Sequence, residues 1–160
     1  MIAALLLCTV VGISDGDTLT ARCAERSTSS ASEQEVLRTI KVRLADIDAP
    51  EKAQPFGQRS KQYLSDLCFR KQAEVVPQAR LDRYGRTVAH VRCEGQDANA
   101  AQVKAGMAWV YTRYATKGSS LQAIQAKAMD DRRGLWSDDH PVPPWDWRRL
   151  KRGGGAGPGS

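Results

Sequence analysis

Polar and charged residues gather in three short stretches of the chain. Residues 14–18 read S-D-G-D-T, residues 43–51 read R-L-A-D-I-D-A-P-E, and residues 82–86 read D-R-Y-G-R. Each stretch alone is weak evidence, because D-G-D-T is usually a hairpin turn, a strand arginine is usually solvated and Y-G-R is usually only a turn. Together they contain the groups that hydrolysis of a phosphodiester requires.

The chemistry follows from the residue types. Asp17 and Asp48 offer two hard oxygen ligands, and a backbone carbonyl and waters can complete a Ca²⁺ shell. Arg43 and Arg86 offer planar guanidinium groups that bind phosphate oxygens in pairs. Glu51 offers a carboxylate that can orient or deprotonate a water molecule. The sequence therefore indicates a site at which a phosphate, a cation and a water could meet.

Turn and periodicity signals predict the elements that must position these groups. Strands are expected at residues 8–14, 18–23, 37–47, 73–77 and 86–93, and helices at residues 56–68, 97–105 and 119–133. Asp15-Gly16 is a hairpin signal between the first two strands, and Pro50 interrupts the third. The pattern predicts an α+β, mainly β fold, a five-stranded OB-like barrel with three helices.

Length and composition predict one domain. The chain has 160 residues and 41% hydrophobic residues, which suits a single core. We expect the domain at residues 9–147, a solvated loop at 24–36, a surface segment carrying two tryptophans at 141–147, and a basic, glycine-rich flexible tail at 148–160. The net charge is +6, but Arg148, Arg149, Lys151 and Arg152 lie in this tail, so basicity alone supports nucleic-acid binding only weakly.

Four scattered cysteines indicate disulfides rather than a metal site. Cys8, Cys23, Cys68 and Cys93 contain no C-x-x-C pair, and their even number fits two disulfides in an oxidising compartment. Three pairings are possible, and four reduced thiols in a cytosolic protein are the alternative. Because Cys8 and Cys23 flank the first hairpin, and the other two end a helix and a strand, we predict the pairs Cys8–Cys23 and Cys68–Cys93.

The start of the chain is apolar but short. Residues 1–8, M-I-A-A-L-L-L-C, resemble the end of a signal-peptide hydrophobic region that runs into the first strand. The segment is too short to span a membrane. We therefore expect a periplasmic or secreted protein without stable membrane association, acting as a monomer.

The three stretches, in this order and at these separations, resemble the staphylococcal nuclease family. The resemblance covers roughly residues 9–136 and includes the D-G-D-T hairpin, the R-L-x-x-I-D-x-P-E strand exit, the D-x-Y-G-R turn and a closing G-L-W. It implies a nuclease acting on DNA and RNA with Ca²⁺ as cofactor, little sequence specificity and 3′-phosphate products. No single piece of the pattern is specific, but the combination is.

The resemblance also implies roles for individual residues. Asp17, Asp48 and the carbonyl of Ala49 would hold Ca²⁺, where alanine replaces a common threonine but keeps its carbonyl. Arg43 and Arg86 would bind the scissile phosphate, and Glu51 would act on the attacking water. The residues that would bind a neighbouring nucleotide are Arg83, Tyr84 and Tyr114.

Two other classes of protein compete with this interpretation. A non-catalytic OB-fold module could bind single-stranded nucleic acid without cutting it. Such modules typically lack one of the two arginines, the metal carboxylates or the glutamate, whereas all five are present here. A secreted structural domain with a chance motif is the second alternative.

Overall fold

The computed structural model describes residues 4–27, 34–111 and 119–154. Its elements are β1 (Leu6–Asp15), β2 (Thr18–Ser27), β3 (Gln34–Leu44), β4 (Ile47–Asp48), α1 (Gly57–Cys68), β5 (Gln72–Leu81), β6 (Thr87–Cys93), β7 (Gln96–Asp97), α2 (Ala98–Lys104), β8 (Trp109–Val110), α3 (Ser120–Asp130), a 3₁₀ turn (Gly134–Ser137) and α4 (Pro144–Gly154). The expected α+β, mainly β architecture is confirmed.

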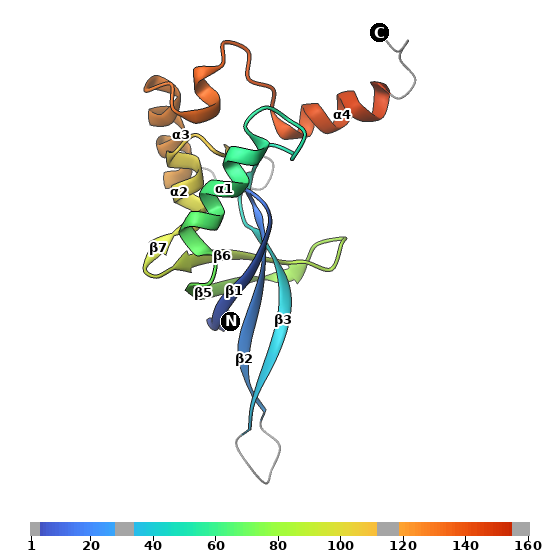
Figure 1. Cartoon of the computed structure of the whole chain (residues 1–160), viewed down its shortest axis with the longest axis vertical. Coiled ribbons are helices and arrows are strands. Elements are labelled where there is room, and N and C mark those ends of the chain that lie inside the picture. The colour runs from blue at the N-terminus through green and yellow to red at the C-terminus, as the bar shows by residue number, and fades with distance from the viewer. Residues whose placement is uncertain (1–3, 28–33, 112–118, 155–160) are drawn as a thin grey trace.

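Five strands form the closed barrel. The sheet order is β3-β2-β1-β5-β6, with the short β7 at the end, and β3 pairs with β6 in parallel to close the ring. The closing pairs are Val42 with Thr87, Arg43 with Val88 and Leu44 with Ala89. The barrel lies below the helices in Figure 1. Closure places the end of β3 directly beside the start of β6.

Alternation along β3 separates a face buried in the core from the opposite face. Val42 and Leu44 are fully buried in the core, while Arg43 between them points to the other face. The core continues through strands β1, β2, β5 and β6 to α1 and α2, and contains Val10, Leu19, Leu64, Val75, Val91 and Val103.

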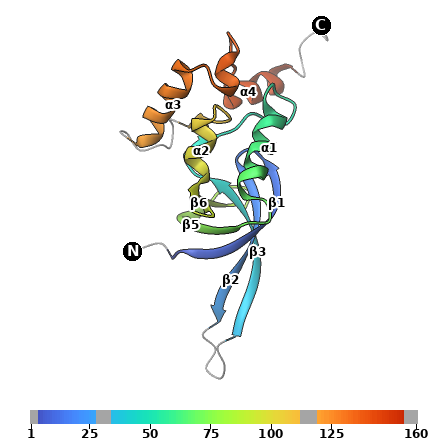
Figure 2. The same ribbon diagram turned by 60° about the vertical axis from the view of Figure 1, so that its left-hand side comes forward.

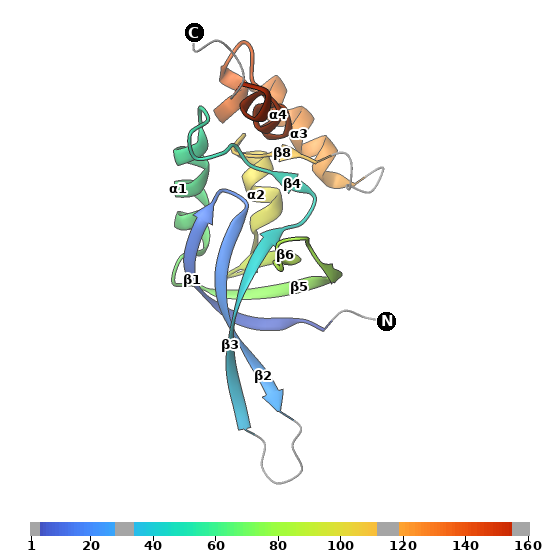
Figure 3. The same ribbon diagram turned by 90° about the vertical axis from the view of Figure 1, so that its right-hand side faces the viewer.

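Two expectations, about a loop and about the C-terminal end, are wrong. Residues 24–27 and 34–36 belong to β2 and β3, which pair down to Ser27 and Gln34, so much of the expected loop is a two-stranded ribbon. This ribbon projects from the barrel away from the helices (Figures 2 and 3). Leu6 to Cys8 pair with β5, so this part of the apolar start belongs to the barrel.

The C-terminal segment is the second region that differs from the expectation. The described residues contain four α-helices rather than three, because α4 spans Pro144 to Gly154 where a surface segment and a flexible tail were expected. Pro144 begins this helix, a position at which proline is favoured because its missing N–H has no intrahelical partner. Figure 3 shows α4 at the helical end of the molecule, above β4 and β8. Among the described residues, no helix has the length and apolar character needed to cross a membrane.

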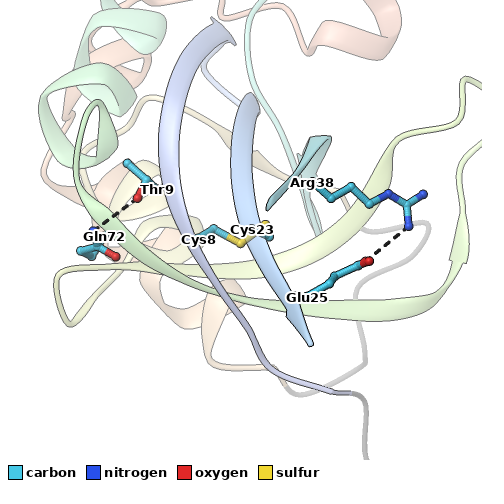
Figure 4. The surroundings of a disulfide bond; sticks show 6 residues. All are labelled: Cys8, Thr9, Cys23, Glu25, Arg38 and Gln72. Atoms are coloured by element: carbon cyan, nitrogen blue, oxygen red, sulfur yellow. Dashed lines mark hydrogen bonds and ion pairs between the residues drawn. A yellow bond between two sulfur atoms is a disulfide. The ribbon is translucent and has the colours of Figure 1, made fainter. Parts of the chain in front are cut away.

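Both predicted disulfides are present. Cys8 and Cys23 lie opposite each other on β1 and β2, and their sulfur atoms are bonded (Figure 4). Cys68, at the end of α1, is bonded to Cys93, at the end of β6. The first bond therefore staples the hairpin that carries the first polar stretch, and the second ties α1 to the barrel.

Removing the first disulfide should destabilise the fold without altering the site. The bond links residues 15 apart, and in the chain-entropy account a loop of that size contributes about 3 kcal/mol to the free energy of unfolding. The Cys8→Ala/Cys23→Ala double variant should lose about this amount in urea unfolding. Non-reducing peptide mapping of the unmodified protein is the companion measurement, and four free thiols there would contradict the assignment.

Candidate active site

The β1–β2 hairpin presents Asp17 next to the strand exit that follows β3. A Cβ at Gly16 would lie 1.7 Å from Ser60 Oγ, so only glycine lets the turn pack this closely on α1. The buried side chain of Gln102 donates from Nε2 to the Gly16 carbonyl (2.6 Å). Held in this way, Asp17 accepts a hydrogen bond from the backbone N–H of Ala49 at Oδ2 (2.7 Å).

Arg43, at the end of β3, is fixed between two carboxylates. Its Nη1 donates to the carbonyls of Leu44 (2.8 Å) and Ile47 (2.7 Å). Its Nη2 lies 3.2 Å from Asp48 Oδ1 and 3.5 Å from Asp17 Oδ2. The two hydrogen bonds to backbone carbonyls orient the guanidinium group. Its Nη2 is the atom that Asp17 and Asp48 both approach.

Local contacts also fix the backbone around Asp48 and Glu51. Asp48 lies on β4, opposite Trp109 of β8, and is 1% exposed. The backbone N–H of Glu51 donates to Gln54 Oε1 (3.1 Å). A Cβ at Gly57 would meet the Glu51 carbonyl at 1.9 Å, so the start of α1 packs directly on this turn. The backbone that carries Asp48 and Glu51 is therefore held in place on both sides.

Arg86 is positioned by the turn between β5 and β6. Asp82 Oδ1 accepts the backbone N–H groups of Tyr84 and Arg86 (2.9 Å each), and Oδ2 accepts Arg86 Nε (2.6 Å). Burial is the largest single influence and opposes ionisation, but the hydrogen bonds from Arg86 and Tyr84 together outweigh it and hold the pKa of Asp82 below its ordinary value. Arg86 Nη1 also reaches Thr18 Oγ1 (3.5 Å), whose hydroxyl donates to Asp17 (2.9 Å). Arg86 is thus linked to the carboxylates through Thr18.

Helix α4 brings a third arginine to this group. Arg148 Nη2 lies 2.7 Å from Asp48 Oδ2, and Nη1 lies 2.9 Å from Glu51 Oε1 and 3.3 Å from Asp48 Oδ1. The hydrogen bond to Asp48 raises the pKa of Arg148 above its ordinary value, and the bond to Glu51 adds to this against the effect of burial. Sequence reasoning missed this residue.

Burial and mutual repulsion act on the carboxylates of the site. Burial raises the pKa of Asp48, and the neighbouring Asp17 adds to the rise, while Arg148 and Arg43 counter it. Burial also raises the pKa of Asp15, with further repulsion from Asp17 and Glu51. Asp15 is therefore a further acidic neighbour of the site, which sequence reasoning did not assign although it stands in the first polar stretch.

The structure brings most of the predicted site residues together. Asp17, Arg43 and Asp48 are in direct contact, and Glu51 joins Asp48 through Arg148. The other predicted residues do not all join this group. Ala49 contacts Asp17 through its N–H, and Arg83 and Tyr84 lie in the exposed turn, where Arg83 Nη2 donates to the tyrosine hydroxyl (2.7 Å). Tyr114 lies outside the described residues.

Asp17 and Asp48 are the side chains that would supply oxygen donors to a hard cation. Two buried carboxylates, Asp17 and Asp48, converge on the point that Arg43 occupies with its Nη2, and the backbone of Ala49 adjoins them. Within residues 4–27, 34–111 and 119–154, no group of three or more His, Cys, Asp or Glu side chains is arranged to hold a metal ion. Oxygen donors of this kind fit Ca²⁺, with waters and substrate oxygens completing its shell.

Comparison with known proteins places this geometry in a family. Residues 41–138 match the family model described as staphylococcal nuclease homologue. An uncharacterized endonuclease of Haemophilus influenzae is 46% identical over 91% of this chain and 74% of its own length. A micrococcal nuclease of Shigella flexneri is 40% identical over 89% of this chain and 80% of its own length. With the match over residues 41–138 and these identities, the chain belongs to the staphylococcal nuclease family.

Proposed function

We propose that the protein is a calcium-dependent nuclease that hydrolyses DNA and RNA with little sequence specificity. The observation that carries the proposal is the fixed position of Arg43 between Asp17 and Asp48, with Arg86 and Glu51 around them. This arrangement puts guanidinium donors and a pair of carboxylates at one point. Relatives named as nucleases support the same assignment.

Each side chain has a role in this reaction. Arg43 and Arg86 bind the non-bridging phosphoryl oxygens and stabilise the charge that grows on them during in-line attack. Glu51 orients the attacking water and accepts its proton. Asp17 and Asp48 hold Ca²⁺, which when bound supplies further positive charge to the phosphoryl oxygens.

The same contacts account for the expected lack of base preference. Guanidinium groups that bind phosphate oxygens carry no information about base identity. Arg83 and Tyr84, in the exposed turn beside Arg86, would bind the neighbouring nucleotide. Cleavage that leaves 3′-phosphate ends is proposed from the family resemblance. Two disulfides support an oxidising compartment, and so a periplasmic or secreted protein.

Metal removal tests the proposal. Two carboxylates should bind Ca²⁺ weakly in the absence of nucleotide, with a dissociation constant on the order of 10⁻⁴ to 10⁻³ M. Plasmid cleavage should therefore stop on addition of a calcium chelator and return with excess Ca²⁺. Full activity in the chelated sample would contradict calcium dependence. An oligonucleotide that binds but is not cut, with Ca²⁺ in excess, would favour the binding module.

A further inference from the structure

Arg148 engages the two acidic residues on which the proposed reaction depends. Its guanidinium contacts both oxygens of Asp48, at 2.7 Å and 3.3 Å, and Oε1 of Glu51 at 2.9 Å. These partners lie about a hundred positions earlier in the chain, at separations of 100 and 97 residues. The contact therefore depends on the docking of α4 and not on any local turn.

Several interactions dock α4 in this place. Trp145, in its first turn, packs edge-on against Trp109 of β8 (5.7 Å between ring centroids) and lies 5.4 Å from the ring of Tyr111. Gln54, beside the Glu51 turn, donates to the carbonyl of Val142 just before the helix. Figure 1 shows α4 beside the segment that joins β4 to α1. The helix is thus attached to the same strand exit that carries Asp48.

The neighbouring arginine shows how an ordinary surface residue of this helix behaves. Arg149 is 78% exposed and makes only a long ion pair with Asp146 on the same helix (3.7 Å) among the contacts of the described residues. Arg148 is 38% exposed and points at a carboxylate that is almost completely buried. The pair Arg148–Asp48 is therefore part of the site.

A cation bound at Asp48 would displace this contact. Both oxygens of Asp48 are engaged by arginines in the free protein, so Arg148 and a cation compete for them.

We propose that Arg148 is a third phosphate-binding arginine, which is held on Asp48 and Glu51 in the free protein and transfers to the substrate phosphodiester when a cation occupies the carboxylates. This inference rests on the proposed nuclease function. The planar guanidinium group suits both partners, because carboxylate and phosphate accept the same pair of parallel hydrogen bonds. Transfer would also free Glu51 to take up the attacking water. Because bound substrate would draw Arg148 away from Asp48, the affinity for the cation would be higher when substrate is bound.

The test is a pair of titrations on Arg148→Gln, with Arg149→Gln as the matched control on the same helix. Calorimetry measures Ca²⁺ binding to the free protein, then binding of a dinucleotide whose bridging 5′ oxygen is replaced by CH₂, at saturating Ca²⁺. Arg148→Gln should bind Ca²⁺ alone about tenfold more tightly and the dinucleotide about tenfold more weakly, a typical coupling between two sites. Arg149→Gln should match the wild type in both.

A second variant and a stability measurement keep the result interpretable. Arg148→Lys keeps the charge but loses the paired donors, so its Ca²⁺ affinity should stay near that of the wild type while its dinucleotide affinity falls. Urea unfolding checks that each variant is folded. An Arg148→Gln protein that binds Ca²⁺ no more tightly, or the dinucleotide no more weakly, than Arg149→Gln overturns the proposal. Wild-type plasmid cleavage is measured alongside, and its absence would instead overturn the nuclease function itself.

Discussion

Replacing Arg43 with lysine should slow cleavage far more than it weakens substrate binding. Lysine keeps the positive charge, but one ammonium group cannot replace a guanidinium that bonds to the Leu44 and Ile47 carbonyls through Nη1 and faces Asp48 through Nη2. The variant loses a preorganised donor to the phosphoryl oxygens, which should cost ~3 kcal/mol of transition-state stabilisation, or roughly a hundredfold in rate. The measurement is kcat and KM on a defined oligonucleotide, and Arg86→Lys should behave similarly.

The same strand offers a matched control. Arg38 lies five positions earlier on β3, is 66% exposed and pairs with Glu25 at 3.3 Å. Figure 4 draws this pair. Arg38→Lys makes the same chemical change where no phosphate is expected, and an exposed pair contributes about 1 kcal/mol or less to stability. Its kinetics should match the wild type. If Arg43→Lys also cuts within a factor of about three of the wild type, Arg43 does not bind the reacting phosphate.

The central site could be predicted because its residues stand where short-range signals are strong. A D-G pair marks the hairpin that presents Asp17, and a proline directly after Ala49 marks the strand exit that presents Asp48 and Glu51. The antiparallel pairing of β2 with β3 then brings the two stretches together, with Thr18 opposite Arg43. Each polar stretch is short, so local geometry determines most of what the site contains.

The β2–β3 ribbon was missed because its composition is that of a loop. Residues 24–36 are rich in serine and charged side chains, which favours a solvated turn. In the structure the two strands continue the pairing that the barrel begins, and an exposed pair such as Glu25 with Arg38 spans them. Backbone pairing that extends from a stable sheet does not require apolar side chains on both faces.

Helix α4 was missed because a basic, glycine-containing terminus is typical of a flexible tail. The local signal that could have predicted it is Pro144 before the W-D-W-R-R run, since proline is favoured at the first position of a helix. No local signal distinguishes Arg148 from Arg149, however. Only the docking of the helix, through Trp145 and Trp109, decides which of the two reaches Asp48.

Replacing Glu51 with glutamine should nearly abolish cleavage while leaving the protein able to bind. The side chain keeps its size, and its amide oxygen can still accept the hydrogen bond that Arg148 Nη1 now gives to Oε1 (2.9 Å). The variant cannot accept a proton from water, so the rate should fall by roughly 10² to 10⁴ if Glu51 prepares the nucleophile. The measurement is single-turnover cleavage, with Ca²⁺ and dinucleotide binding measured in parallel and expected to persist together.

The choice of control decides what a loss of activity means. Glu74 is an exposed residue on β5, and Glu74→Gln makes the same change outside the site. It should cut at the wild-type rate, because removing one distant surface charge leaves the reacting groups untouched. Substantial and equal cleavage by the Glu51→Gln and Glu74→Gln variants would remove Glu51 from the mechanism and leave the arginines and carboxylates to carry it. If the wild type and both variants bind nucleic acid but none of them cuts it, the barrel is a binding module. The absence of cleavage would then not depend on Glu51.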